Sequence, residues 1–189
     1  GVQTCALPIL TVHNGETHLK KCIDSVLSQT FGDFECITLN NGSTDRTQEI
    51  LEQYTDSRLK IIQQENIGVS RSLNKGIHLS KSNLIARLDA DDVASKYRLE
   101  RQVEFMIKNP KVILCGSKFR ELIGVKSLPQ RVAFIETDPS IRKSMSLFNP
   151  FSHSTVIFRK QNFIQAGGYN DQYRNSLDYE LWLRMLDLG

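Results

Sequence analysis

The chain has 189 residues, of which 40% are hydrophobic and 24% charged, and its formal net charge is +3. This length and composition are those of about one globular domain. No run reaches the roughly 18 apolar residues that a membrane-spanning helix needs, and no basic face with interleaved aromatic residues favours nucleic acid as a partner.

The first nine residues, GVQTCALPI, look like a translated sequencing adapter rather than a natural terminus. They contain neither an initiator Met nor a signal-peptide pattern. We therefore interpret residues 1–9 as non-native and residues 10–189 as one domain. We expect its first strand to begin at Leu10, and we expect the native protein to continue beyond Gly189.

Strand and helix patterns alternate as far as residue 110, which predicts βαβ units and a mostly parallel sheet. Strands are expected at residues 10–12, 34–39, 59–63 and 84–88. Asn14 is expected to cap the first helix, and Asp45 with Gln48 to form a capping-box-like pair at the second. Apolar residues at helical spacing mark the four helices: Leu19, Ile23, Val26 and Leu27; Ile50, Leu51 and Tyr54; Val69, Leu73 and Ile77; Leu99, Val103, Met106 and Ile107.

The second half is less regular. It predicts strands at residues 112–115 and 155–158, an irregular segment at 119–135 and a final helix near residue 180. No linker rich in Gly, Pro or Ser separates it as a domain of its own. Outside the first nine residues, Cys22, Cys36 and Cys115 are widely spaced in apolar segments, so we expect core residues in a reducing compartment rather than a zinc site or a disulfide framework.

Three carboxylates, Asp89, Asp91 and Asp92, directly follow the fourth expected strand. Parallel strands end at the crevice where open α/β sheets bind ligands. Carboxylate oxygens are ligands that Mg²⁺ and Mn²⁺ prefer. We therefore predict a divalent cation that carries an anionic substrate. The alternative is an acidic turn in which Asp91 or Asp92 caps the helix at 97–108.

Seven segments, in order along the chain, resemble the family 2 glycosyltransferases. They are TVHNGE (11–16), SQTF (28–31), NGSTD (41–45), NIG (66–68), LNKG (73–76), ARLDADD (86–92), and GGY (167–169) followed by DYELWLR (178–184). The resemblance implies a GT-A fold, which is a Rossmann-like, three-layer α/β architecture with a mostly parallel central sheet.

The same resemblance implies an inverting, metal-dependent transfer of a sugar from a nucleoside-diphosphate sugar, with uridine as the favoured base. The acceptor would be a hydroxyl of a saccharide or lipid-linked molecule, in the synthesis of a bacterial surface polysaccharide or glycolipid. Such an enzyme is expected in the cytoplasm, and the longer protein could associate with the inner face of the membrane.

The resemblance also implies roles for individual residues. Asp89 would face the donor ribose, and Asp91 or Asp92 would hold Mg²⁺ or Mn²⁺ at the diphosphate. Asp178 would be the general base, unless it only caps the final helix. The residues implied at the donor nucleotide are Thr11, His13, Asn14, Asn41, Arg71, Asp89 and Asp91.

Some residues differ from the family pattern, and for others a second role is possible. Asn40 and Asn41 replace two aspartates, and Leu177 replaces a glutamate, which raises a catalytically silent nucleotide-sugar-binding domain as the alternative function. Asn41 could be a simple turn residue. Arg71 could be a solvated helix-face residue rather than a diphosphate ligand. His153 could lie beside the acceptor or be structural, while Arg87 is expected to pair with a carboxylate of the acidic cluster.

A nucleotidyltransferase on a similar sheet is disfavoured. That function would need a Gly-rich phosphate loop after the first strand, and residues 11–16 contain none.

Overall fold

The computed structural model describes residues 6–123, 126–127, 135–173 and 175–189. Its centre is a six-stranded sheet in the order β3-β2-β1-β4-β8-β5, and β6 and β7 form a separate two-stranded sheet. The strands are β1 (Ala6–Val12), β2 (Cys36–Asn41), β3 (Leu59–Gln64), β4 (Leu84–Arg87), β5 (Leu114–Cys115), β6 (Leu122–Ile123), β7 (Lys126–Ser127) and β8 (Ile157–Arg159).

The four strands of the first half are parallel, as the alternation of strand and helix patterns predicts. β1 pairs with β2 on one side and with β4 on the other, and β3 pairs with β2. β8 then joins β4 antiparallel, with Ile157 opposite Ala86. The start of β8 therefore lies at the same edge of the sheet as the carboxyl ends of β1, β2 and β4.

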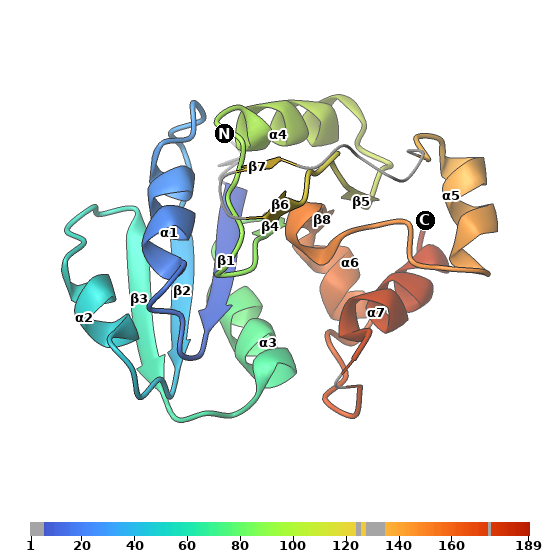
Figure 1. The fold of residues 1–189 in the computed structure, drawn as a ribbon. Coiled ribbons are helices and arrows are strands. Elements are labelled where there is room, and N and C mark those ends of the chain that lie inside the picture. The colour runs from blue at the N-terminus through green and yellow to red at the C-terminus, as the bar shows by residue number, and fades with distance from the viewer. Residues whose placement is uncertain (1–5, 124–125, 128–134, 174) are drawn as a thin grey trace.

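Helices cover both faces of the sheet, so the molecule has three layers (Figure 1). On one face, α3, α6 and α7 share a core cluster with Leu7 and Ile9 of β1. On the other face, α1 and α4 pack on Ala6 and Leu10, while α1 also packs against α2. The helices are α1 (Leu19–Leu27), α2 (Thr47–Glu52), α3 (Val69–Leu79), α4 (Arg98–Lys108), α5 (Asp138–Met145), α6 (Lys160–Gln165), α7 (Leu177–Leu186) and the 3-10 turn η1 (His153–Thr155).

The first strand begins earlier than expected. β1 includes Ala6 to Ile9, and Ala6 and Leu7 lie opposite Leu84 and Ile85 of β4. These residues extend the apolar pattern of residues 10–12 and are fully buried at Ala6, Leu7 and Ile9, so the fold uses them as sheet. The origin of residues 1–9 stays a prediction.

The prediction that Asn14 caps the first helix is wrong. α1 starts five residues later, at Leu19, with His18 before it. Asn14 adopts a left-handed backbone, with φ of 55°, and its side-chain oxygen accepts the Thr44 N–H at 2.8 Å. The Asn14 side chain therefore hydrogen-bonds the loop after β2 and does not cap a helix.

The second helix and the second half also differ in detail. Asp45 does accept the Thr47 N–H, at 3.0 Å, but Gln48 bonds Asn40 and Glu52 instead of completing a capping box. In the second half, α5 and α6 are additional helices of eight and six residues, too short for a clear apolar repeat. The expected irregular segment includes β6 and β7, and part of it lies outside the described residues.

The expectation that the three cysteines are core residues is confirmed for two of them. Cys22 and Cys36 are buried, Cys115 is half-buried, and all three are free thiols. Burial raises the pKa of Cys115 to about 11 and raises that of Cys22 and Cys36 still further above the usual value, so these groups are protonated core residues.

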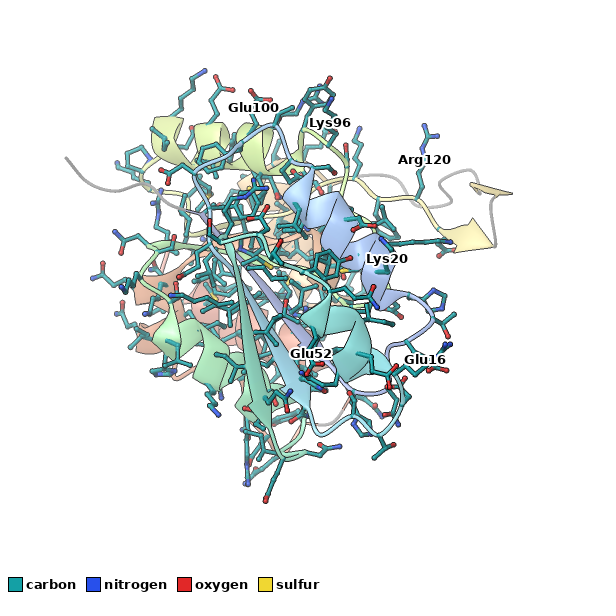
Figure 2. The ribbon with its side chains drawn as sticks, turned by 90° about the vertical axis from the view of Figure 1, so that its left-hand side faces the viewer. Glu16, Lys20, Glu52, Lys96, Glu100 and Arg120 are labelled. Atoms are coloured by element: carbon teal, nitrogen blue, oxygen red, sulfur yellow. The ribbon has the colours of Figure 1, made fainter. Side chains whose placement is uncertain are left out.

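Charged side chains cover the outer surfaces of the helical layers. Figure 2 shows Lys20 on α1, Glu52 on α2 and Glu100 on α4, all of which are exposed. Within the described ranges, no helix is both long and apolar enough to cross a bilayer.

Candidate donor and catalytic site

The acidic cluster lies where the parallel strands end. Asp89 follows β4 by two residues, and η1 brings Ser154 against it from the antiparallel side of the sheet. The Asp89 N–H donates to Ser154 Oγ at 2.8 Å, and Ser154 Oγ donates to Asp89 Oδ2 at 2.7 Å. The topology thus joins residues that are 65 positions apart in the sequence.

Arg87 supports the same carboxylate from inside the sheet. Its guanidinium is 1% exposed, and Nη2 lies 2.5 Å from Asp89 Oδ1, so the expected pairing within the acidic cluster is confirmed. Nη1 donates to the carbonyl oxygen of Leu88. Burial opposes ionisation of Asp89, but Arg87 and the Ser154 bond outweigh it and hold the pKa of Asp89 below its usual value.

His153 precedes Ser154 in η1 and lies in the protein interior. Its Nε2 lies 2.8 Å from the Tyr169 hydroxyl, and its ring meets the rings of Tyr169 and Trp182 edge-on. Burial, with a further contribution from Arg87, lowers the pKa of His153 to about 3. His153 is therefore a neutral, hydrogen-bonded residue of the interior. Of the two alternatives for His153, this fits a structural role better than a role as a titrating group beside the acceptor.

Asp91 and Asp92 are exposed and do not cap a helix. α4 begins at Arg98, after Tyr97, and has no side-chain cap, so the alternative of an N-cap at Asp91 or Asp92 is wrong. Burial raises the pKa of Asp92, and with the neighbouring charges of Asp89 and Asp91 it outweighs a side-chain hydrogen bond with Ser154, which lowers the pKa. In the described part of the chain, neither carboxylate forms a salt bridge.

These two carboxylates fit a divalent cation chemically. Two adjacent, unneutralised carboxylates supply hard oxygen ligands, and Mg²⁺ commonly takes only one or two carboxylates and completes its shell with water and substrate phosphates. Among the described residues, no group of three or more His, Cys, Asp or Glu side chains that could hold a metal ion is present. Any such cation would need oxygens from a ligand.

Asp178 lies in the first turn of α7, two residues after Ser176, and makes no capping bond. Its Oδ2 accepts a hydrogen bond from Asn149 Nδ2 at 2.8 Å. Burial raises the pKa of Tyr169, and the negative charges of Asp178 and Asp89 add to the rise. The ring of His153, which is next to Ser154, also meets the ring of Trp182, one helical turn after Asp178 on α7, so the packing brings α7 and Asp178 toward the Asp89 region.

Asn41 is a buried hub rather than a turn residue. It ends β2 and is 2% exposed. Its Nδ2 donates to Asn66 Oδ1 at 3.1 Å. Its Oδ1 accepts three bonds, from Gln64 Nε2 at 3.0 Å, the Ile67 N–H at 3.0 Å and Ser72 Oγ at 2.9 Å. The side chain is therefore engaged within the protein and orders the loop between β3 and α3.

His13 and Asn14 extend this polar edge. His13 Nδ1 lies 3.0 Å from the Asn41 backbone carbonyl oxygen, which can only accept, so Nδ1 donates this bond. The Asn14 and Gly15 N–H groups donate to Ser43 Oγ at 3.0 Å and Thr47 Oγ1 at 2.8 Å, which join the loops after β1 and β2. Thr11 is half-buried within β1, two residues before His13.

Arg71 lies further along the edge, on α3. Its guanidinium is 65% exposed and pairs with Asp171, with Nη2 at 2.5 Å and Nε at 2.7 Å from Oδ2. Both residues line a polar cavity of about 490 Å³ between α3 and the start of α7. The ion pair is exposed, which fits a helix-face residue, and a diphosphate would have to compete with Asp171 for the Arg71 guanidinium.

Four residues that contribute to the site were not assigned a role from the sequence. Ser154 and Asn149 hold Asp89 and Asp178, and the Tyr169 hydroxyl bonds His153. Asn74 also ties α3 to this region, because its side chain makes two bonds of 2.8 Å with the Tyr169 backbone. Tyr169 and Asn74 lie inside the motifs GGY and LNKG, and Ser154 is adjacent to His153, whereas Asn149 carried no sequence signal.

Comparisons with known proteins agree with this architecture. A family model described as glycosyl transferase family 2 matches residues 9–181. The chain is 34% identical over 187 residues to the O-antigen biosynthesis glycosyltransferase WbnJ of Escherichia coli, covering 95% of this chain and 70% of that protein. It is 29% identical to the amylovoran biosynthesis glycosyltransferase AmsE of Erwinia amylovora, covering 96% and 69%.

Solved structures show the same fold at lower identity. S. aureus TarS 1-349 in complex with UDP has a TM-score of 0.74 at 19% identity, covering 95% of this chain and 55% of that one. The mannosyltransferase PcManGT from Pyrobaculum calidifontis, in complex with GDP-Man and Mn²⁺, has a TM-score of 0.64 at 15% identity, covering 87% and 47%. The expected GT-A fold is confirmed, and the chain spans about half the length of these solved chains.

Proposed function

The chain belongs to glycosyl transferase family 2 and is therefore a transferase, and from this premise we propose that it moves a sugar from a UDP-sugar to a hydroxyl acceptor with inversion at the anomeric carbon. The observation that carries the proposal is that Asp89, held by Arg87 and Ser154, and the exposed Asp91 and Asp92 follow the end of β4, while α7, which carries Asp178, packs against the neighbouring His153 through Trp182.

The donor half of the proposal rests on the edge formed by β1, β2 and β4. Asp89 would accept hydrogen bonds from the ribose, and the exposed ring of His13 would stack on the base. Asn41 is saturated by protein donors, so we assign it to ordering the base pocket together with Thr11 and Asn14 rather than to a direct bond with the base. Two structures of TarS, with UDP and with UDP-GlcNAc, support uridine as the base.

Asp91 and Asp92 would hold Mg²⁺ or Mn²⁺ together with the diphosphate of the donor. When bound, such a cation neutralises the charge that develops on the departing diphosphate. Arg71 would add a second positive charge once a diphosphate displaces Asp171 from it. The Mn²⁺ in the PcManGT complex supports this choice of cation.

Asp178 would act as the general base on the acceptor hydroxyl. A carboxylate that receives the proton as the hydroxyl attacks contributes typically 10²- to 10⁴-fold to such a reaction. Asn149 fixes one oxygen of Asp178 and leaves the other for the acceptor. Direct attack by the acceptor, on the face opposite the diphosphate, produces inversion.

The acceptor is proposed to be part of a bacterial surface polysaccharide or glycolipid. This proposal rests on two relatives whose names place them in the synthesis of O-antigen and amylovoran.

Titration calorimetry with UDP tests the donor site. We expect UDP to bind in the presence of Mn²⁺ and more weakly after chelation, GDP to bind more weakly than UDP, and Asp91→Ala to remove the Mn²⁺ dependence. The matched control is Asp33→Ala, a loop carboxylate before β2 that should leave UDP binding unchanged. Folded protein that binds neither nucleotide would refute the donor site, and UDP binding without turnover of any UDP-sugar would favour the silent binding domain.

A further inference from the structure

The hydroxyl of Ser154 makes a reciprocal pair of bonds with Asp89. It accepts from the Asp89 backbone at 2.8 Å and donates to Asp89 Oδ2 at 2.7 Å. Ser154 is 7% exposed and belongs to η1, which leads into β8. We propose that Ser154 is a positioning residue that sets the orientation of Asp89 toward the donor ribose, an inference that rests on the proposed function.

The Asp89 carboxylate needs such a partner because its side chain is still 40% exposed. Arg87 holds only Oδ1, at 2.5 Å, and a carboxylate held at one oxygen can swing about that contact. Ser154 holds the other oxygen from a different element, on the antiparallel strand's side. Two contacts from two elements fix the plane of the carboxylate.

This arrangement leaves Asp89 able to bind a ligand. Each carboxylate oxygen has a second acceptor site after accepting one protein bond. Two neighbouring ribose hydroxyls could therefore donate to Oδ1 and Oδ2 without displacing Arg87 or Ser154. Asp91 and Asp92 remain exposed for a cation.

The test compares UDP with 2′-deoxy-UDP and 3′-deoxy-UDP, each titrated into the folded protein with saturating Mn²⁺. A hydrogen bond to a charged group corresponds to a preference of about 10-fold or more, so we expect the wild type to prefer UDP over at least one deoxy analogue by about that factor. Ser154→Ala should reduce this preference to about 2-fold or less. Ser154→Thr keeps the hydroxyl and should restore it.

The matched control is Ser152→Ala, the same substitution on the residue before η1. It should preserve the wild-type preference. Ser154→Cys, which replaces the hydroxyl by a poor hydrogen-bonding group of similar shape, serves if the alanine variant does not fold. A merely structural role for Ser154 would weaken UDP and both analogues alike, and that result would overturn the inference, as would an unchanged preference.

The outcomes separate this inference from the proposed function. If wild-type protein binds UDP and prefers it over a deoxy analogue but Ser154→Ala does so equally, the donor site stands and the role of Ser154 is refuted. If folded wild-type protein binds none of the three nucleotides, the donor site itself is refuted and the inference fails with it.

Discussion

The Asn41 side chain uses both its oxygen and its nitrogen in hydrogen bonds within the protein. Its oxygen accepts from a side-chain amide, a backbone N–H and a hydroxyl, while its nitrogen donates to Asn66. An aspartate at this position would lack the donor that reaches Asn66 Oδ1. The asparagine is thus explained by the local hydrogen bonds and is no sign of lost catalysis by itself.

We predict that Asn41→Ala lowers the free energy of unfolding by about 1–3 kcal/mol, because the donors on Gln64, Ile67 and Ser72, which make buried or partly buried bonds, lose their acceptor. Urea unfolding at neutral pH measures this change. Asn109→Ala, which removes one exposed bond to the Phe105 carbonyl oxygen, is the control and should cost less. Equal effects of the two substitutions would contradict the role of Asn41 as a hub.

Asp178→Asn should remove turnover while sparing the donor site. The amide has nearly the shape of the carboxylate but cannot accept the acceptor's proton, so we expect a fall in kcat of about 10²- to 10⁴-fold. The measurement is turnover of the UDP-sugar found to be the donor, together with calorimetry of UDP binding. A parallel loss of UDP affinity would argue against a general base at this position.

At the scale of elements, the site depends on a connection between α3 and the loop that leads to α7. The Asn74 side chain accepts the Tyr169 N–H and donates to the Tyr169 carbonyl oxygen, both at 2.8 Å. Gly168, with φ of 73°, lets the backbone approach so closely that an added Cβ would lie 2.9 Å from Asn74 Oδ1. This connection joins the donor-side helix to the segment that carries Asp178.

We therefore predict that Asn74→Ala destabilises the protein by about 2 kcal/mol, since two partly buried backbone groups lose their partners. Lys75→Ala, on the adjacent position of α3, removes only an exposed bond to Gln64 and should change stability by less than about 1 kcal/mol. Urea unfolding compares the two variants. A cost for Asn74→Ala no larger than that for Lys75→Ala would refute the connection.

At the scale of the whole molecule, His153 makes stability depend on pH. Its pKa is lowered from 6.5 to about 3 in the folded protein, so the unfolded chain takes up this proton at a pH where the folded chain does not. Stability is therefore lost as the pH falls below about 6.5. Linkage gives a loss of about 2 kcal/mol between about pH 7.5 and about pH 5.

Urea unfolding at these two pH values tests the expectation. His153→Gln keeps a hydrogen-bonding group near Tyr169 but does not titrate, so its stability should change much less over the same interval. The other three histidines, His13, His18 and His78, are exposed and serve as the background common to both proteins. An identical pH dependence in the variant would exclude His153 as the cause.

Donor binding should also stabilise the whole fold. A ligand present at about 100 times its Kd adds about 2.7 kcal/mol to the free energy of unfolding, which for a domain of this size corresponds to a rise in Tm of about 5–10 °C. We expect this rise with UDP and Mn²⁺ together, and its loss after chelation with EDTA. A rise that survives chelation would contradict the proposed dependence on a divalent cation.

The sequence by itself determined the class of fold and the family. Periodic apolar residues depend only on nearby positions, so the parallel strands and the four helices of the first half were predictable, with end points shifted by a few residues. The motifs that placed Asp89, Asp91, Asp92 and Asp178 are local as well. β1 differed at its start because residues set aside as non-native continue its apolar pattern.

Only the tertiary structure decided how these residues are held. The partner of Asp89 is 65 positions away, on a turn that reaches the site because β8 runs antiparallel to β4. The saturation of Asn41 and the connection from Asn74 to Tyr169 likewise join distant loops. A local pattern of apolar residues specifies which face of an element is buried, whereas a hydrogen-bond partner across the sheet edge is chosen only when the packed elements bring it within about 3 Å.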